Sequence, residues 1–460
     1  MKNMIFLKRT ILLSILLFSY GCTSFLEVKP NVNLSTPETL EDFRALLDDE
    51  SKINRMYPGL VEMGTDDFFI NYDTWASRDV FDQDIYLWKA EPIYQPKNMG
   101  HWSSAYLNIA TANVVLEGLA RTGLEPTEEG KRIKGEALFI RGLHFFYLAQ
   151  VYSPVYEKDN ESSSLGIPLK LTSSVDDRTV RSTLAETYTQ IIADLALSAE
   201  LLPSSTEYLT RATVVAANAA LSKVYLSMGD YEQSLVYAER VLEANPNLMD
   251  YNSLDVNNRN PFPLSGNPEI LYFAASSSAG SLLFSSRANV DTLLYDSFSD
   301  GDLRKQAFFN AKGGKLYSFK GFYSGSEVSY FAGLATDEMY LNKAECLVRL
   351  NRVDDGVSTL NDLLVTRWKK GEFVPYSSLG KMDALKLVLK ERRKEMIRRG
   401  TRWSDLKRLN LDASQAITLT RKHGPNGNPQ TYTIEPNDLR YVYLIPQNVI
   451  EITKISQNPR

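Results

Sequence analysis

The stretch LSKVYLSMGDYEQSLVYAERVLEANP, residues 221–246, decides the fold class of this 460-residue chain. Leu221 and Tyr225 lie one helical turn apart, and Ser234, Ala238 and Val241 follow at three- and four-residue spacing. This is the spacing of apolar faces on helices. Because Ser234 and Ala238 are small, two antiparallel helices can approach closely there, with Tyr225 filling the groove between them. The stretch therefore predicts a helical hairpin, which cannot bury its apolar face alone.

A second segment, residues 340–368, repeats this register. Its key positions are Tyr340, Ala344, Leu347, Gly356, Leu360 and Leu363. Both segments, the first continuing to Pro246, follow the spacing of the tetratricopeptide repeat. Since such hairpins must stack on neighbours, we expect a mostly α fold with a tetratricopeptide-like helical-repeat scaffold. Between the two hairpins, residues 247–335 are rich in Asn, Ser, Gly and Pro, and predict an irregular, loop-rich insertion with a few short strands.

Periodicity also predicts helices outside these hairpins. They are expected at residues 36–49, introduced by Ser35-Thr36-Pro37, at 102–119, 133–151 and 183–202, and from about Ala384 to Gly400. In the segment 102–119, Trp102 is expected in the core because it shares a face with Tyr106 and Ile109. Residues 54–100 are expected to be loop-rich. In the tail from Gln430 to Arg460, Tyr432 and Ile434, and later Tyr441, Tyr443 and Ile445, alternate as in a strand that closes on Pro446.

The first twenty-two residues, MKNMIFLKRTILLSILLFSYGC, have the layout of an export signal. Basic residues precede the apolar run 11–18, which is too short to span a bilayer as a helix. The cysteine at position 22 directly follows Gly21 and resembles the lipobox of bacterial lipoproteins, in which cleavage leaves lipid on that cysteine. We therefore expect a signal peptide at residues 1–21, lipidation of Cys22 and a tether at residues 22–35. The alternative is an ordinary cleaved signal with an incidental cysteine.

The composition argues against several classes of function. The formal net charge is −5, so a nucleic-acid partner is not expected. The basic cluster from Arg392 to Arg402 contains interleaved carboxylates and is expected to be a charged helix face.

The three histidines are isolated, and no spacing of metal ligands occurs, so neither a metal nor a cofactor is predicted. The acidic run Asp79, Asp82 and Asp84 lacks the spacing of a calcium loop. Cys346 lies in a helical apolar pattern and is expected to be a buried thiol.

Several motifs together resemble one protein family. They are W-x3-Y-x2-I-x3-N at 102–113, GEALFIRGLHFFYL at 135–148, GIPL at 166–169, IIADLALSAELLP at 191–203, DEMYLNKAECLVRL at 337–350, ERRKEMIRRGTRWSDLKRL at 391–409, LIP at 444–446 and QNP at 457–459. In their order and spacing the chain resembles the SusD/RagB family of outer-membrane nutrient-binding lipoproteins. The resemblance implies a helical-repeat scaffold that carries a loop-built binding face. It also implies a partner, a SusC-like TonB-dependent transporter, and a lipid-anchored position facing the cell exterior.

This resemblance sets the expected organisation of the chain. Residues 36–460 are expected to form a single SusD/RagB-like domain. Its N-terminal part covers about 36–246, the middle insertion about 247–335, and the C-terminal part about 336–460.

A sugar site needs flat aromatic rings beside planar polar groups, because sugars present both C–H faces and hydroxyls. The stretch from Asp66 to Trp88 has this mixture, and in family members the site combines this stretch with the middle insertion. The residues predicted to bind ligand are Asp67, Tyr72, Asp73, Trp75, Arg78 and Tyr323.

The expected function is non-catalytic capture of an oligosaccharide and its delivery to the transporter. The first alternative is a peptide-binding member of the same family. A glycan-acting enzyme would need two suitably spaced carboxylates, and these residues are plentiful in the chain. No nucleophile elbow, metal motif or phosphate loop occurs, however, and we expect no enzymatic activity. A purely structural repeat protein is the last alternative.

Overall fold

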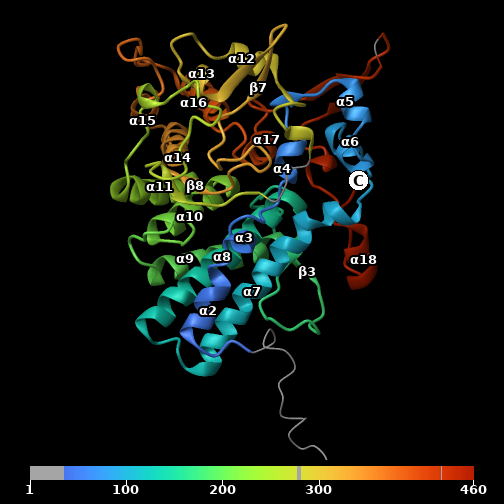
Figure 1. Ribbon diagram of the computed structural model, residues 1–460, viewed down its shortest axis with the longest axis vertical. Helices are drawn as coiled ribbons and strands as arrows, with labels where there is room; N and C mark the ends of the chain where they lie inside the picture. Colours follow the sequence, from blue (N-terminus) through green and yellow to red (C-terminus); the bar gives the residue numbers. More distant parts are fainter. Residues whose placement is uncertain (1–35, 277–280, 426) are drawn as a thin grey trace, which may run out of the picture.

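The computed structural model describes residues 36–276, 281–425 and 427–460. About half of this part of the chain is helical, and the helices stack one on the next in chain order (Figure 1). The stack consists of α7 (Gly100–Thr122), α8 (Glu128–Tyr152), α9 (Leu184–Leu201), α10 (Val214–Met228), α11 (Tyr231–Ala244), α14 (Thr336–Arg349), α15 (Val353–Leu364) and α16 (Lys381–Glu395). The expected mostly α, repeat-based fold class is therefore confirmed.

The two predicted hairpins are α10–α11 and α14–α15, and α11 packs directly on α14. The insertion, residues 247–335, thus leaves the stack without interrupting it. Within the first hairpin, the Ser222 and Ser234 hydroxyls each donate a hydrogen bond to the other residue's carbonyl, at 3.0 and 2.9 Å. Within the second, a Cβ on Gly356 would lie 2.8 Å from the Ala344 carbonyl oxygen. Small residues therefore bring the helices together, as the repeat pattern predicts.

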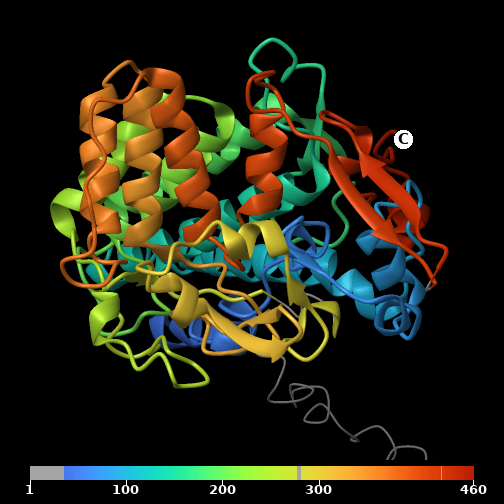
Figure 2. The same ribbon diagram turned by 90° about the horizontal axis from the view of Figure 1, so that it is seen from above.

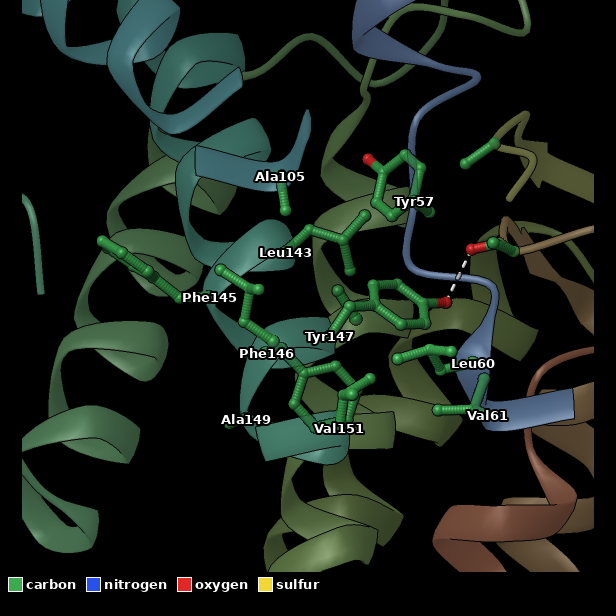
Figure 3. Packing of buried hydrophobic residues seen from close by; sticks show 14 of the residues in the cluster. Tyr57, Leu60, Val61, Ala105, Leu143, Phe145, Phe146, Tyr147, Ala149 and Val151 are labelled. Atoms are coloured by element: carbon green, nitrogen blue, oxygen red, sulfur yellow. Dashed lines mark hydrogen bonds between the residues drawn. The ribbon is translucent and has the colours of Figure 1, made fainter. Parts of the chain in front are cut away.

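Helix α8 lies at the centre of the core and is buried on every side from Gly135 to Tyr152. A helix that is apolar all round belongs in an interior, and each large apolar side chain buried there contributes roughly 1.5–3 kcal/mol. Its side chains pack against Tyr57, Leu60 and Val61 from the N-terminal part of the chain (Figure 3). The hydroxyl of Tyr147 donates to the Ala332 carbonyl at 2.6 Å and so ties α8 to the insertion.

Short elements surround the stack. The remaining α-helices are α2 (Leu40–Leu47), α3 (Glu50–Ile53), α4 (Leu60–Met63), α5 (Tyr72–Ala76), α6 (Val80–Tyr86), α12 (Thr292–Asp296), α13 (Arg304–Phe308), α17 (Arg402–Leu409) and α18 (Gln447–Thr453). Single 3-10 turns occur at η3 (Pro96–Met99), η4 (Tyr251–Ser253), η5 (Ser281–Leu283) and η6 (Leu439–Tyr441). Figure 2 shows the insertion, in yellow, along one side of the stack.

The strands form antiparallel pairs. These are β1 (Phe68–Phe69) with β5 (Asn289–Val290), β2 (Leu165–Pro168) with β3 (Arg181–Thr183), β4 (Ile270–Tyr272) with β8 (Leu334–Ala335), β6 (Phe309–Gly313) with β7 (Leu316–Phe319), and β9 (Leu419–His423) with β10 (Gln430–Ile434). The pair β1–β5 joins the N-terminal part of the chain to the insertion, with Phe68 opposite Val290.

Three expectations about helices need correction. The helix expected at residues 36–49 begins at Leu40, as α2, because the Thr39 side chain caps its N-terminus and pairs with Asp42 in a capping box. Residues 54–100 contain α4, α5 and α6 and are not merely loops. The helix expected to reach Gly400 ends at Glu395, and the chain then turns through Arg398, which has φ +60°.

The strand expected around Tyr432 and Ile434 is confirmed as β10, but the strand expected around Tyr443 is wrong. Residues 442–446 lie in no strand, and their backbone groups bond to other parts of the molecule. Tyr443 N–H donates to the Val151 carbonyl at the end of α8. The Gln457 side-chain amide accepts from the Ile445 N–H at 2.8 Å and donates to its carbonyl at 2.7 Å, as a neighbouring strand would.

The predicted signal peptide, Cys22 and the tether 22–35 lie outside the described residues. Within the described ranges, no helix is both long enough and apolar enough to cross a membrane. Trp102 is 6% exposed and packs on Tyr106 and Tyr152, which confirms its expected place in the core. Cys346 is fully buried as expected, and burial raises the pKa of its thiol to about 12.

Candidate functional site

A cleft of about 340 Å³ lies where three distant parts of the chain meet. The N-terminal part supplies β1 and the end of α6, the insertion supplies the start of α12, and the C-terminal part supplies β9 and the residues before it. The apolar and aromatic lining consists of Phe68, Phe69, Tyr86, Trp88, Leu293, Ile417 and Leu419. The charged lining consists of Asp66, Asp291, Arg393, Arg421 and Lys422. Aromatic rings and planar polar groups therefore face one cavity.

A row of aromatic rings, here called the ladder, leads from this cleft to α5. It runs from Phe68 to Tyr86, His423, Trp75 and Tyr72, with successive ring centroids 5.8, 5.3, 5.0 and 5.6 Å apart. The first rings are buried, whereas Trp75 and Tyr72 are half-buried on the short helix α5. Trp75 is held in place because its indole N–H donates to the Gln83 carbonyl at 3.1 Å. The ladder thus presents fixed rings at the surface beside the cleft.

Ion pairs hold the floor of the cleft. Arg402 binds both carboxylate oxygens of Asp66 at 2.8 and 2.9 Å, and Arg393 pairs with Asp67 at 2.9 Å. Burial opposes the charged form of Asp66, yet the Arg402 and Arg393 guanidinium groups hold the pKa of Asp66 below its ordinary value. These pairs join the segment before β1 to the C-terminal region, so they fix the position of β1.

The structure distributes the predicted ligand residues unevenly. Tyr72 and Trp75 come together in the ladder, and Asp73 is exposed on the same helix. Asp67 is 3% exposed and lies beneath the cleft in its ion pair with Arg393. Burial raises the pKa of Asp67, against the opposing effect of that guanidinium.

The other two predicted residues are not members of the ladder, although the backbone N–H of Arg78 donates to the Trp75 carbonyl at 2.9 Å. Arg78 is half-buried and donates to the Ser77 hydroxyl. Tyr323 is 3% exposed in the core of the insertion, where its hydroxyl donates to Glu269 at 2.7 Å and lies 3.0 Å from that of Tyr251. The structure therefore does not bring Tyr323 to this cleft.

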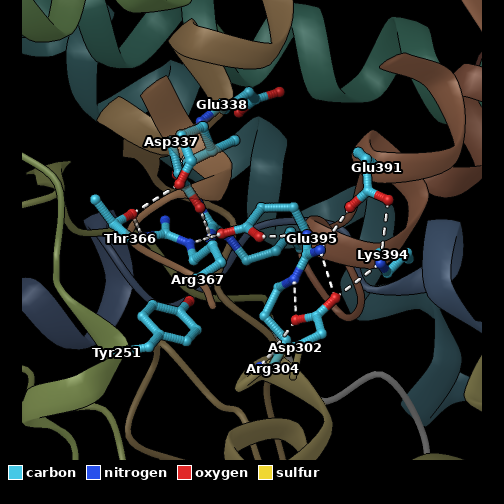
Figure 4. Close-up of polar contacts among 12 residues, drawn as sticks. Tyr251, Asp302, Arg304, Asp337, Glu338, Thr366, Arg367, Glu391, Lys394 and Glu395 are labelled. Atoms are coloured by element: carbon cyan, nitrogen blue, oxygen red, sulfur yellow. Dashed lines mark hydrogen bonds and ion pairs between the residues drawn. The ribbon is translucent and has the colours of Figure 1, made fainter. Parts of the chain in front are cut away.

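A buried ion-pair network holds the insertion against α16 (Figure 4). Arg304 of α13 is completely buried and pairs with Asp302, Glu391 and Glu395 at 2.7, 2.5 and 3.0 Å. Lys394 also reaches Asp302, at 2.8 Å. The basic cluster expected as a charged helix face is thus largely buried, because carboxylates from distant segments pair with it. The network positions the insertion, which carries α12 to the cleft.

Comparisons with known proteins identify this architecture. Residues 24–226 match a family described as starch-binding and associating with the outer membrane, and residues 336–459 match the SusD family. The chain belongs to the SusD/RagB family. The two matches lie on either side of the insertion, which contributes α12 to the cleft.

Individual relatives of this SusD/RagB chain are distant. The SusD-like protein P2 of Formosa agariphila is 27% identical over 143 residues, which are 31% of this chain and 26% of that protein. A SusD superfamily protein from Bacteroides thetaiotaomicron has a TM-score of 0.73 at 23% identity, covering 92% of this chain and 100% of the other. A SusD-like carbohydrate binding protein from Bacteroides vulgatus has a TM-score of 0.70 at 22% identity, covering 91% and 97%. At these identities the structural likeness establishes the fold.

Among the site residues that the sequence interpretation missed are Arg421 of the cleft and His423 of the ladder. Both face inward on β9, more than 330 residues after α5 and α6, whereas Thr420 and Lys422 between them face outward. The available signal was this alternation, in which Leu419, Arg421 and His423 share one face of a strand. An arginine and a histidine on the buried face of a strand indicate a polar site beneath it.

Proposed function

We propose that this protein is a non-catalytic outer-membrane lipoprotein that captures an extracellular oligosaccharide and delivers it to a SusC-like TonB-dependent transporter. The observation that carries the proposal is the ladder beside the cleft. Half-buried Trp75 and Tyr72 offer ring faces to the C–H faces of a sugar, and the charged groups of the cleft offer hydrogen bonds to its hydroxyls. The carbohydrate-binding description of the Bacteroides vulgatus relative supports the same ligand class.

Isothermal titration against a panel of plant and host oligosaccharides tests this proposal. We expect one glycan class to bind, and we expect Trp75→Ala to weaken that binding at least several-fold because the stacking surface is lost. Tyr208→Ala is the matched control, since Tyr208 is 53% exposed on the loop between α9 and α10. Equal binding by all three proteins would contradict the assignment of the ladder, and no binding of any glycan would contradict the ligand class.

Peptide capture is the second candidate function, and one observation favours it. The strand β9 pairs with β10 on one side, and within the described part of the chain no strand pairs with its other side. Residues 417–422 line the cleft, so an extended peptide has an edge to which it can add as a further strand. Binding of short peptides in the same titrations, with no response to glycans, would favour this candidate.

An enzyme would instead degrade the bound oligosaccharide, so recovery of the intact oligosaccharide after long incubation separates capture from catalysis.

The anchor and the partner need tests of their own. We propose that Cys22 carries lipid, and incorporation of labelled fatty acid should therefore disappear in the Cys22→Ala variant. We further propose that a SusC-like TonB-dependent transporter co-purifies with the protein from detergent-solubilised outer membranes. Co-purification that persists in Trp75→Ala while uptake falls would contradict a purely structural role.

A further inference from the structure

The cations of the cleft are not all neutralised. Arg393 pairs with Asp66 and Asp67, and Arg402 pairs with Asp66. Arg421 also lines the cleft, but among residues 36–276, 281–425 and 427–460 it forms no ion pair. The carboxylate that acts on it electrostatically is Asp66, which these two other guanidinium groups already engage. The cleft therefore contains a guanidinium group without a counter-ion of its own.

The surroundings of Arg421 fix its position but leave donors available. It is 7% exposed, and its guanidinium group donates to the backbone carbonyls of Tyr86 and Thr65. The guanidinium carbon lies 4.0 Å from the ring centre of Tyr86 and 4.4 Å from that of Trp88. Because a guanidinium group has five N–H donors, these two bonds leave three for another partner.

A buried charge without an ion-pair partner is costly, and rings and carbonyls compensate it only in part. Arginine remains protonated in proteins, so the group cannot relieve this cost by losing its proton. An anion that enters the cleft would supply the missing charge through charge-assisted hydrogen bonds. The second guanidinium group of the cleft, on Arg393, has a side chain that is 25% exposed. It can therefore share such an anion at the mouth.

We infer that the cleft selects an acidic oligosaccharide, whose carboxylate or sulfate group binds Arg421 while an adjacent sugar ring stacks on the ladder. This inference rests on the proposed function and specifies its ligand class. The cleft and the outer rings of the ladder are continuous, because Tyr86 lines the cleft and His423 connects it to Trp75. One ligand can therefore occupy both.

Calorimetry with galacturonic acid oligomers, their methyl esters and sulfated galactan oligomers tests the inference. We expect at least one acidic series to bind roughly tenfold or more tightly than uncharged oligomers of equal length, since hydrogen bonds to charged groups are about twice as strong as neutral ones. We also expect this preference to shrink as salt is added. Arg421→Gln should remove the preference, whereas Arg259→Gln should keep it, because Arg259 lies in the insertion with its side chain 81% exposed.

The outcomes separate this inference from the proposed function. If charged and uncharged oligomers bind equally tightly, and both bind less tightly to Trp75→Ala, the inference is wrong but the proposed capture of oligosaccharides is supported. Binding of no saccharide, or of acidic peptides alone, overturns both. If Arg421→Gln folds, as judged by circular dichroism, and keeps the preference, Arg421 is not the anion-binding residue. If that variant does not fold, two measurements on the wild-type protein still decide whether the cleft selects an anion. These are the affinity for the acidic oligomers relative to their methyl esters, and the salt dependence of that affinity.

Discussion

Replacement of Arg304 by methionine should destabilise the protein by about 3–5 kcal/mol, the usual cost of removing one partner from a buried ion pair. Arg304 is completely buried, and it pairs with three carboxylates. Without it, Asp302 and Glu391 share the single ammonium group of Lys394, at 2.8 and 3.1 Å. A negative charge is then left uncompensated in the interior.

The matched control is Arg259→Met, the same change at the surface. The Arg259–Glu327 pair is 2.9 Å long, but the arginine side chain is 81% exposed. Such pairs contribute about 0–1 kcal/mol, so this variant should unfold close to the wild-type midpoint. Urea unfolding followed by circular dichroism and by tryptophan fluorescence measures both variants, and coincidence of the two transitions shows whether unfolding occurs in a single step.

The effect of Arg304→Met should also depend on pH. In the wild-type protein, burial opposes the charged form of Asp302, yet Arg304 and Lys394 hold its pKa at about 2. In the variant the pKa of the buried carboxylates rises, so a proton taken up by the folded state relieves the excess charge. The difference in free energy of unfolding between wild type and variant should therefore narrow as the pH falls from 7 towards 4. A loss no larger than that of Arg259→Met, or one that is constant with pH, would refute this account of the network.

Three further predictions concern the scaffold. Gly356→Ala should destabilise the α14–α15 hairpin by roughly 1–3 kcal/mol, because the new methyl group would lie 2.8 Å from the Ala344 carbonyl oxygen. Gly100→Ala is the control, since its methyl group has room, and thermal melts compare the two variants. A His144→Gln variant should lose less stability than the wild-type protein as the pH falls from about 6.5 to about 4, since burial lowers the pKa of His144 to about 3 while the unfolded chain binds a proton there near 6.5. Equal shifts of the two melting points would contradict this prediction. Lys407→Met should lower the free energy of unfolding in urea by about 1–3 kcal/mol, because the Lys407 ammonium group donates to two backbone carbonyls at the end of α8. An unchanged unfolding midpoint would show that these hydrogen bonds do not stabilise the fold.

The sequence predicts the helical stack well because local spacing determines it. Helices α7, α8 and α9 begin and end within a few residues of the predicted ranges, since their apolar positions recur at the helical period. Tyr443 misled the interpretation for a different reason. Its segment is extended and alternates like a strand, but the groups that satisfy its backbone belong to α8 and to the side chain of Gln457. Alternation reports an extended backbone and does not identify its partner.

The candidate site was only partly predictable, because its residues come from distant segments. The aromatic residues Trp75 and Tyr72 have the composition of a binding surface and could be selected from the sequence alone. The alternation along β9 indicates that Arg421 and His423 are buried, but it does not indicate what they contact, because only folding brings them to Tyr86. Selecting Tyr323 by composition failed to locate the cleft, because an aromatic residue in a loop-rich segment packs into the core of that segment just as readily.

The same distribution explains how the fold separates stability from recognition. The stack buries α8 and closes its hairpins through contacts between successive helices, so changes at the cleft leave those contacts intact. The cleft depends instead on long-range links, namely the β1–β5 pairing, the Asp66–Arg402 ion pair and the network around Arg304. The loops between these links can vary in sequence without disturbing the scaffold. One repeat scaffold can therefore carry different binding faces, and the ligand must be deduced from the cleft residues and not from the fold.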